Sequence, residues 1–335
     1  MAWYKGNTHT HTMNSDGDAY PADAIRWYHD HGYHFIVLSE HNYHTHAGNL
    51  PEMADLRHDF LVVPGEELSG AKHVHFICFN SRWPVDIFTV DRTLPVDALV
   101  REYAACAAKA GGIPILNHPN WRFTATADDI AAAPEVCLLE IYNGNEDDIY
   151  NYGFTPSGNE TDKKALPPVE DLWDDLLSRG KTVYGVGADD THHYEKKGPQ
   201  CCNPGRGFVM VHAPELSASA LGKALLTGDF YASSGVALRE SRMERGGCRL
   251  AIDIAATEEN LREDCHHGND VYPGREGFRV EFVGEGGRLV KRVEGPEGEF
   301  DPKECGSYVR GRAVYCRSHN GVRRAFYAWT QPLFL

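Results

Sequence analysis

The residues with the clearest chemical potential in this sequence are histidines and carboxylates near the ends of short apolar runs. His9 and His11 end the first run, and Ser15-Asp16-Gly17 follows them. Side chains at positions i and i+2 of a strand point to the same side, so both imidazoles can bind one metal ion. This spacing indicates a metal site at the end of the first strand.

Metal-competent side chains also lie at the ends of almost all the other predicted strands. The candidate ligands are His9, His11, Asp16, His41, Glu67, His75, His118, Asp190 and His192. Barrel enzymes build their active sites at the carboxyl-terminal ends of their strands, so such residues can converge. Imidazole and carboxylate ligands without thiolate suit Zn, Mn or Fe. The set exceeds the needs of one ion, so we expect two or three divalent ions with bridging carboxylates and a bridging water.

The elements that must position these residues alternate between strand and helix patterns up to about residue 230. This order is typical of a parallel α/β sheet or barrel. The predicted strands are 3–8, 35–39, 61–64, 74–79, 113–116, 138–141 and 182–187. The predicted helices are 21–29, 96–110 and 217–227, with Pro21 at the first turn of one and Gly228 at the end of another.

From about residue 236 the pattern changes to strands and tight turns. Predicted strands lie at 249–255, 278–283, 288–293, 308–317 and 323–330. The segments 284–287 and His319-Asn320-Gly321 are hairpin signals. We therefore predict an α/β barrel at 1–235 and a small all-β, sandwich-like domain at 236–335. A long polar stretch from Asn143 to about Pro168 follows the sixth predicted strand and has neither a helix nor a strand pattern. We interpret it as a lid because loops of this length are usually functional.

Composition excludes several classes of protein. The chain has 335 residues, 42% hydrophobic and 24% charged, which is ordinary for a globular protein. Its net charge of −15 would repel a polyphosphate backbone, so we expect no nucleic-acid partner. The apolar runs are too short to span a bilayer and no signal peptide is evident, so we expect a cytoplasmic protein without a membrane partner. The 9 cysteines are odd in number and lack a C-x-x-C motif, which argues against a disulfide framework.

In their order along the chain, the candidate ligands resemble the motifs of the PHP (polymerase and histidinol phosphatase) metallohydrolases. The matching segments are His9-x-His11 with Ser15-Asp16-Gly17, Glu40-His41, Pro64-Gly65-x-Glu67, His75, His118-Pro119 and Asp190-x-His192, across about residues 1–230. The resemblance implies a distorted seven-stranded (β/α) barrel with a trinuclear centre. It would place the first ion on His9, His11, Glu67 and Asp190, the second on Glu67, His75 and His118, and the third on Asp16, His41 and His192.

Two positions depart from the family pattern. Family members commonly carry Gly-Ser-Asp-x-His at the last motif, whereas this chain has Asp189 and Asp190. Asp190 stands two residues before His192 and so shares its strand face, which favours it as the ligand and leaves Asp189 a supporting role. Glu66 occupies a position that is often apolar, so we expect Glu67 to be the ligand.

The β-rich C-terminal region resembles the carbaryl hydrolase-like branch of this family, with 228–235 and Trp329-Thr330-Gln331-Pro332 as the matching segments. Members of that branch cleave bonds other than phosphate esters. Our first hypothesis is a phosphoesterase that hydrolyses a small phosphorylated metabolite through a metal-bridging hydroxide. The alternative is an ester, amide or carbamate hydrolase with the same centre. A metal-loaded binding module is a third hypothesis, but the full ligand set argues against it.

Further residues are candidates for contact with a small-molecule substrate. Arg122 follows His118 by four residues, and its guanidinium fork suits phosphate, so we group it with the catalytic residues Asp190 and His192. The other candidates for substrate binding are Lys72, His44 and His193. Either histidine could protonate a leaving group. Glu140, on the sixth predicted strand, could orient a ligand imidazole. A homo-oligomer is compatible with the sequence.

Overall fold

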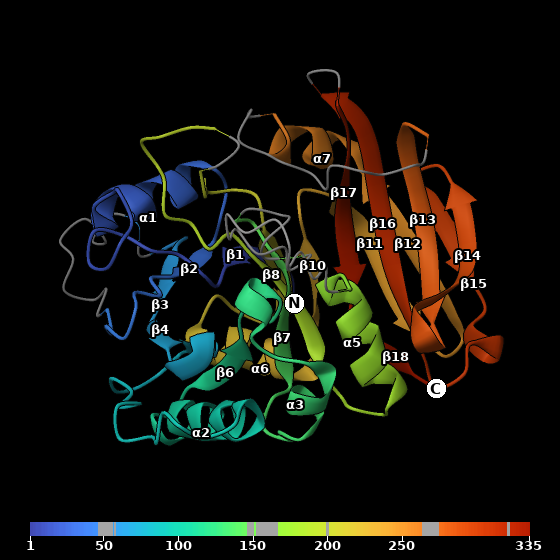
Figure 1. The fold of residues 1–335 in the computed structure, drawn as a ribbon. Helices are drawn as coiled ribbons and strands as arrows, with labels where there is room; N and C mark the ends of the chain where they lie inside the picture. Colours follow the sequence, from blue (N-terminus) through green and yellow to red (C-terminus); the bar gives the residue numbers. More distant parts are fainter. Residues whose placement is uncertain are drawn as a thin grey trace.

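The computed structural model describes residues 1–45, 56, 58–145, 151, 167–198, 201–262, 275–319 and 322–335. In Figure 1 the N-terminal strands lie on the left, the C-terminal strands stand side by side on the right, and α5 lies between them. The helices are α1 (Pro21–Asp30), α2 (Val96–Lys109), α3 (Ala127–Ala131), α5 (Val169–Ser178), α6 (Ala218–Thr227) and α7 (Ile254–Asn260). The strands of the N-terminal half are β1 (Ala2–Asn7), β2 (Phe35–Val37), β3 (Leu61–Val63), β4 (Gly65–Ser69), β5 (His75–Phe79), β6 (Ile113–Leu116), β7 (Leu138–Asn143), β8 (Tyr184–Ala188), β9 (Phe208–Ala213) and β10 (Phe230–Ser233). Those of the C-terminal half are β11 (Ala237–Glu244), β12 (Gly247–Asp253), β13 (Gly277–Gly284), β14 (Arg288–Glu294), β15 (Glu297–Phe300), β16 (Tyr308–His319), β17 (Val322–Thr330) and β18 (Leu333–Phe334).

All seven predicted N-terminal strands form, but a closed seven-stranded (β/α) barrel is not confirmed. The strands divide between two open sheets, one in the order β4-β5-β6-β7-β8 and one that contains β10-β9-β1-β2-β3. The break falls at Pro64, between β3 and β4, because proline has no amide hydrogen to continue a ladder. The sheets are also not wholly parallel, since β5 pairs antiparallel with both β4 and β6. A short connection such as 70–74 permits only antiparallel pairing of β4 and β5.

The two sheets nevertheless share one apolar core and approach each other at one end. Buried side chains of both sheets form a single cluster, with Phe35 of β2 packed edge-on against Phe79 of β5. Two isolated parallel bridges, Thr10 to Thr191 and His41 to Glu67, connect the sheets. Both bridges lie beyond the carboxyl-terminal ends of β1, β2 and β8. The predicted ligands therefore gather where the two sheets meet.

The predicted helices are confirmed as α1, α2 and α6, with ends that agree to within one residue. Pro21 occupies the first turn of α1, where its missing amide hydrogen costs nothing. The hydroxyl of Ser217 accepts a hydrogen bond from the Ala220 amide and caps α6, and Gly228 ends the helix with φ 76°. These helices cover the sheets and hold the strands in place.

The C-terminal strands continue the N-terminal sheet rather than standing apart from it. β10 pairs with β9 on one side and with β17 on the other, so the sheet runs on through β16, β13 and β14. A second sheet, β11-β12-β15, packs on this arm through Leu250, Phe282 and Val309. All five predicted C-terminal strands form, but α7 replaces the end of the first because Asp253 caps a helix there. The boundary predicted at residue 236 follows β10 directly and stays a prediction.

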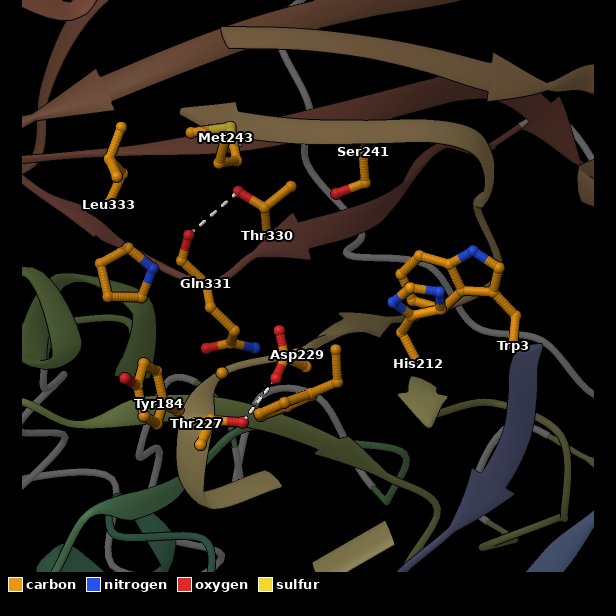
Figure 2. Close-up of a pocket in the computed structure, with 13 residues that line it drawn as sticks. Trp3, Tyr184, His212, Thr227, Asp229, Ser241, Met243, Thr330, Gln331 and Leu333 are labelled. Carbon is orange, nitrogen blue, oxygen red and sulfur yellow. Dashed lines mark hydrogen bonds between the residues drawn. The ribbon is translucent and has the colours of Figure 1, made fainter. Parts of the chain in front are cut away.

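A cavity that is open to solvent lies at the seam between β1 and the C-terminal strands, and Trp3, His212 and Asp229 help to line it (Figure 2). It lies at the amino-terminal end of β1, whereas the predicted ligands follow its carboxyl-terminal end. No helix in the described part of the chain is long and apolar enough to span a membrane. Most of the predicted lid, residues 146–150 and 152–166, lies outside the described residues.

Candidate metal centre

The structure brings all nine predicted ligands together at the junction of the two sheets. Three groups have ligand atoms within 4.8 Å of one another: His9, Glu67 and His118; His9, His11 and Asp190; and His11, Asp16, His41 and His192. The ninth residue, His75, has its Nδ1 atom 3.2 Å from Oε1 of Glu67. His9 and His11 each belong to two groups, so the three groups form one continuous cluster.

Glu67 lies at the centre of the buried part of this cluster. Its Oε1 atom is 3.2 Å from Nε2 of His9 and 3.4 Å from Nε2 of His118, while its Oε2 atom is 2.6 Å from Nδ1 of His41. The side chain is only 1% exposed. A carboxylate whose two oxygens face different histidines can bridge two ions.

Asp190 is the second shared carboxylate. Its Oδ1 atom is 3.1 Å from Nε2 of His9 and 3.3 Å from Nε2 of His11. The backbone of Asp190 has φ 51°, a region that non-glycine residues rarely adopt. Strained conformations of this kind collect at functional sites, because the surrounding structure must hold them in place.

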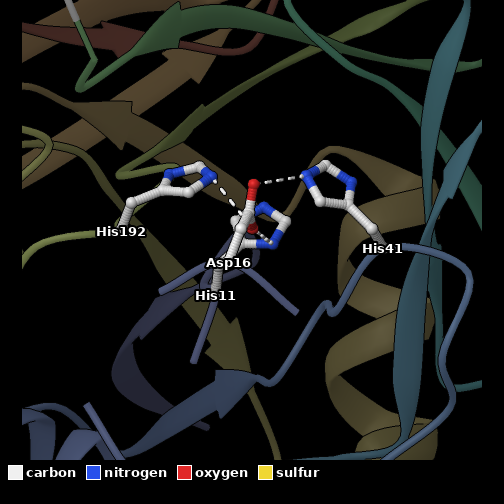
Figure 3. A group of neighbouring side chains, drawn as sticks. All are labelled: His11, Asp16, His41 and His192. Carbon is white, nitrogen blue, oxygen red and sulfur yellow. Dashed lines mark ion pairs between the residues drawn. The ribbon is translucent and has the colours of Figure 1, made fainter. Parts of the chain in front are cut away.

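The third group, drawn in Figure 3, is the most exposed of the three. Asp16 stands between His41 and His192: its Oδ2 atom is 3.4 Å from Nε2 of His41, and its Oδ1 atom is 3.4 Å from Nε2 of His192. Its side chain is 53% exposed. Gly17 allows this turn to form, since a Cβ atom there would lie 2.6 Å from the carbonyl oxygen of His11. Solvent therefore reaches the cluster from the side of Asp16.

The chemistry of the donors fits divalent cations. The Nε2 atoms of His9 and His11 are buried and make no hydrogen bond, although carboxylate oxygens lie close to them. Leaving buried polar atoms without a partner is costly, and a cation between the imidazoles and carboxylates would remove that cost. Despite burial, the neighbouring imidazoles of His75 and His9 hold the pKa of Glu67 well below its usual range. Glu67 is thus ionised, as a ligand must be.

Cation binding at the solvent-facing group competes with protons. Burial lowers the pKa of His41, but the carboxylates of Asp16 and Glu67 outweigh it and raise the pKa to about 10. A histidine ligand must be neutral, so binding of an ion there releases that proton.

Buried polar residues support the ligands from behind. Glu140 accepts a hydrogen bond from the His118 amide at 2.8 Å, and its other oxygen lies 3.0 Å from Nδ1 of His9. This is the orienting contact that we expected of Glu140. Asn117 donates to Oε1 of Glu67 at 2.8 Å, and Asn143 donates to Oδ2 of Asp190 at 3.1 Å. We did not predict either asparagine, although Asn117 directly precedes His118.

We expect Glu140→Gln to weaken metal binding by about 10- to 100-fold, because the amide group cannot serve both His9 and the His118 backbone as the carboxylate does. Calorimetric titration of the metal-free protein with Zn or Mn measures this change in affinity. Glu135→Gln is the matched control, since Glu135 is exposed just before β7. Equal affinities in the two variants would contradict the orienting role.

Asp189 and Glu66, the acidic neighbours of the predicted ligands Asp190 and Glu67, form hydrogen bonds away from the cluster. Oδ1 of Asp189 accepts from the Gly207 amide at 2.6 Å, and Oδ2 accepts from the Tyr28 hydroxyl at 2.7 Å. Asp189 thus links β8 to the start of β9 and to α1. Oε1 of Glu66 accepts from the Val85 amide at 2.7 Å, on the face of β4 opposite Glu67. Burial raises the pKa of Glu66 to about 7.

Three of the residues predicted to contact a substrate form hydrogen bonds with backbone groups. Lys72 donates to the carbonyl of Leu94 at 2.6 Å, Nε2 of His44 lies 3.3 Å from the carbonyl oxygen of Ser81, and Nδ1 of His193 accepts from the Cys202 amide at 3.1 Å. These three side chains are held by backbone groups, and their roles in substrate binding stay predictions.

Arg122 lies at the wall of the cluster. It is exposed, and its guanidinium carbon is 5.2 Å from the ring centroid of Trp121, which in turn lies 5.2 Å from the ring of His118. The exposed ring of His73 is also 5.2 Å from Trp121. We did not predict His73, although His73-Val74-His75 repeats the spacing of His9-Thr10-His11.

No family model and no curated protein matches this sequence. Among solved structures, the chain is similar to a two-domain protein of Bacteroides vulgatus that contains a predicted PHP-like metal-dependent phosphoesterase. Identity is 15% and the TM-score is 0.48, over 97% of this chain and 94% of that chain. The chain is also similar to a protein of Bifidobacterium adolescentis described as a candidate metal-dependent phosphoesterase. In that case identity is 16% and the TM-score is 0.39, over 59% of this chain and 92% of that chain.

Proposed function

We propose that this protein is a metal-dependent hydrolase of the PHP type, which cleaves the phosphate ester bond of a small phosphorylated metabolite. The observation that carries the proposal is the convergence of nine imidazole and carboxylate side chains around Glu67 and Asp190. The three groups described above would each hold a divalent ion, Zn, Mn or Fe. We also propose that the two open sheets, with their shared core, correspond to the distorted barrel of that family.

Divalent ions bound at such a centre activate water and neutralise the charge that develops on the oxygens of a hydrolysed ester. The residues of this chain supply the arrangement. Glu67 and Asp190 join the groups, and Glu140 fixes the ring of His9. Asp16 and its histidines face solvent, so the reacting bond would enter on their side.

Hydrolysis of an ester, amide or carbamate, as in the carbaryl hydrolase-like branch, is the second candidate. A phosphoesterase needs cations for the nonbridging oxygens in addition to its metal ions. Arg122 stacks on Trp121 at the wall, and Lys72 bonds to the carbonyl of Leu94. The hydrogen bond that holds Lys72 to a backbone carbonyl is the observation that favours an acyl substrate.

A hydrolysis panel separates the two functions. We expect release of nitrophenol from nitrophenyl phosphate or bis-nitrophenyl phosphate with Mn, Zn or Fe, and none from Asp190→Asn, which loses a shared ligand. Release only from nitrophenyl acetate or naphthyl carbamate would favour the second candidate. Equal turnover by Asp190→Asn would contradict both.

The same panel tests Arg122. For a phosphoesterase, Arg122→Ala should lower kcat/KM for the phosphate esters by about 100-fold, a typical loss for a group that stabilises transition-state charge. Activity on nitrophenyl acetate should be unchanged. Arg101→Ala is the control, since Arg101 lies on α2 and pairs with Asp97. An unchanged kcat/KM in Arg122→Ala would remove Arg122 from the phosphate site.

A further inference from the structure

The cavity at the seam of the two halves is separate from the metal centre. It has a volume of about 360 Å³, and its lining comes from β1, β8, β9 and β11, from the α6–β10 turn and from residues 330–333. Trp3 of β1 precedes His9 by six positions, and Tyr184 of β8 precedes Asp190 by six positions. At about 3.3 Å per residue, the cavity and the ligands are roughly 20 Å apart. A molecule in this cavity would therefore not touch the reacting bond.

One wall of the cavity is a fixed aromatic surface. The rings of Trp3 and His212 stack with centroids 4.8 Å apart, and Trp3 also packs 5.6 Å from the buried ring of Tyr231. β1 and β9 pair Trp3 with His212 in register, so the backbone holds the two rings together. Trp3 is nevertheless 41% exposed. A large apolar side chain that is rigid and exposed at a cavity is typical of a binding surface.

A carboxylate stands beside this aromatic surface: Asp229 lies across from His212, whose backbone amide donates to the Asp229 carbonyl at 2.8 Å. Oδ2 of Asp229 accepts a hydrogen bond from the Thr227 hydroxyl at 2.6 Å, and the residue is exposed. Burial first, and then the carboxylate of Asp229, raise the pKa of Tyr184, so the phenol near Asp229 stays neutral. Figure 2 shows Asp229 between His212 and Tyr184, with Trp3 beyond His212 and with Ser241 and Met243 on β11 above.

The charge of the cavity selects against anions. Among the lining residues that the structure describes there is neither Lys nor Arg, and Asp229 is the charged one. The whole chain carries a net charge of −15, which adds to the attraction for a cation. Aromatic rings attract cations through the negative faces of their π systems, and tryptophan does so most strongly.

We propose that this cavity binds a small organic cation, an alkylammonium group held by the Trp3–His212 stack and by the neighbouring carboxylate of Asp229. The volume lies within the range of small-molecule sites. The hydroxyls of Tyr184 and Ser241 line the same space and offer oxygen acceptors to a protonated amine. The proposal is independent of the hydrolytic function.

Calorimetric titration of the 335-residue, Mn-loaded chain with choline chloride and with putrescine dihydrochloride tests this site, with sodium chloride at equal ionic strength as reference. We expect saturable binding of at least one amine, with a dissociation constant of about 1 mM or lower. Asp229→Asn, which preserves the size of an exposed side chain, should weaken binding by about tenfold or more. Trp3→Leu should weaken it similarly.

Trp83→Leu is the matched control, because Trp83 is 68% exposed and does not line the cavity. It should bind the amine as the unmodified protein does. Asp190→Asn should also retain binding, so loss of the metal centre and loss of this site can be told apart. Absence of saturable binding by both amines, equal binding by Asp229→Asn, or binding of glucose in their place would overturn the proposal.

Discussion

Replacement of Glu67 by Gln should abolish metal-dependent hydrolysis, with kcat lower by about 1,000-fold and a lower metal content. Both oxygens of Glu67 face imidazoles, of His9 and His118 on one side and His41 on the other. An amide is neutral and offers one acceptor oxygen in place of two, so it cannot join two cation groups. Loss of charge stabilisation in the transition state is worth factors of this size. Elemental analysis after dialysis, together with turnover, measures both effects.

Glu66→Gln is the matched control, since Glu66 is the neighbouring residue, has the same side chain and is equally buried. Its amide oxygen can still accept from Val85, so metal content and turnover should not change. Its own effect should appear in stability. The folded-state pKa of about 7 lies above the ordinary value of 4.5, so the carboxyl destabilises the fold progressively as pH rises from about 5 to about 8. Glu66→Gln should remove that decline.

If metal were lost from Glu66→Gln and retained by Glu67→Gln, Glu66 and not Glu67 would be the metal ligand on β4. Both variants report on a strand whose two faces differ completely in function. Side chains one residue apart point to opposite sides, so a choice between adjacent glutamates is a choice between the site and the far face.

The convergence of the ligands could be predicted from the sequence because it depends on local information. His9, His41 and His118 each follow a short β-rich run, and the carboxyl-terminal ends of strands in such folds meet at one edge. The role of Glu140 could be predicted for a similar reason, because side-chain alternation along β7 points it inward, toward His9.

The division into two sheets was not predicted because it depends on how strands pair. Pro64 was included in the third predicted strand, although it interrupts the ladder there, and β4 was not predicted at all. The C-terminal half shows the same limit: its strands were recognised, but the pairing of β10 with β17, which joins it to the N-terminal sheet, links residues about a hundred positions apart. Such long-range pairing leaves no local pattern.

A buried ionic network between α5 and the C-terminal sheet was also invisible in the sequence. The guanidinium of Arg310 donates to both oxygens of Asp174, at 2.8 and 2.5 Å, and its Nη2 atom is 2.7 Å from Oε1 of Glu170. The hydroxyl of Tyr308 also donates to Asp174, at 2.7 Å. The side chains of Arg310 and Asp174 are 1% and 5% exposed. This network is the polar part of the contact that fixes α5 against β16.

Loss of Arg310 should therefore destabilise the protein strongly. Arg310→Met leaves the carboxylate of Asp174 buried without its cation, whereas Glu170 keeps its pair with Arg312. We expect the free energy of unfolding to fall by about 3–5 kcal/mol in urea denaturation. Arg179→Ala is the matched control, because Arg179 follows α5 and lies as close to Asp175, at 2.6 Å, but is 42% exposed. It should cost less than about 1 kcal/mol, since solvent screens exposed pairs.

The network should also make the protein acid-sensitive in a defined range. Burial raises the pKa of Glu170, but the guanidinium groups of Arg312 and Arg310 outweigh it and lower the pKa to about 2. A carboxyl whose pKa falls on folding contributes stability above its unfolded value near 4.5, and that contribution is lost as pH falls toward 2. The free energy of unfolding should decline between about pH 5 and pH 2, less steeply in Glu170→Gln. If the free energy of unfolding declines equally steeply with falling pH in both proteins, Glu170 does not contribute to this acid sensitivity. If Arg179→Ala lowers the free energy of unfolding as much as Arg310→Met does, burial is not the reason for the strength of the network.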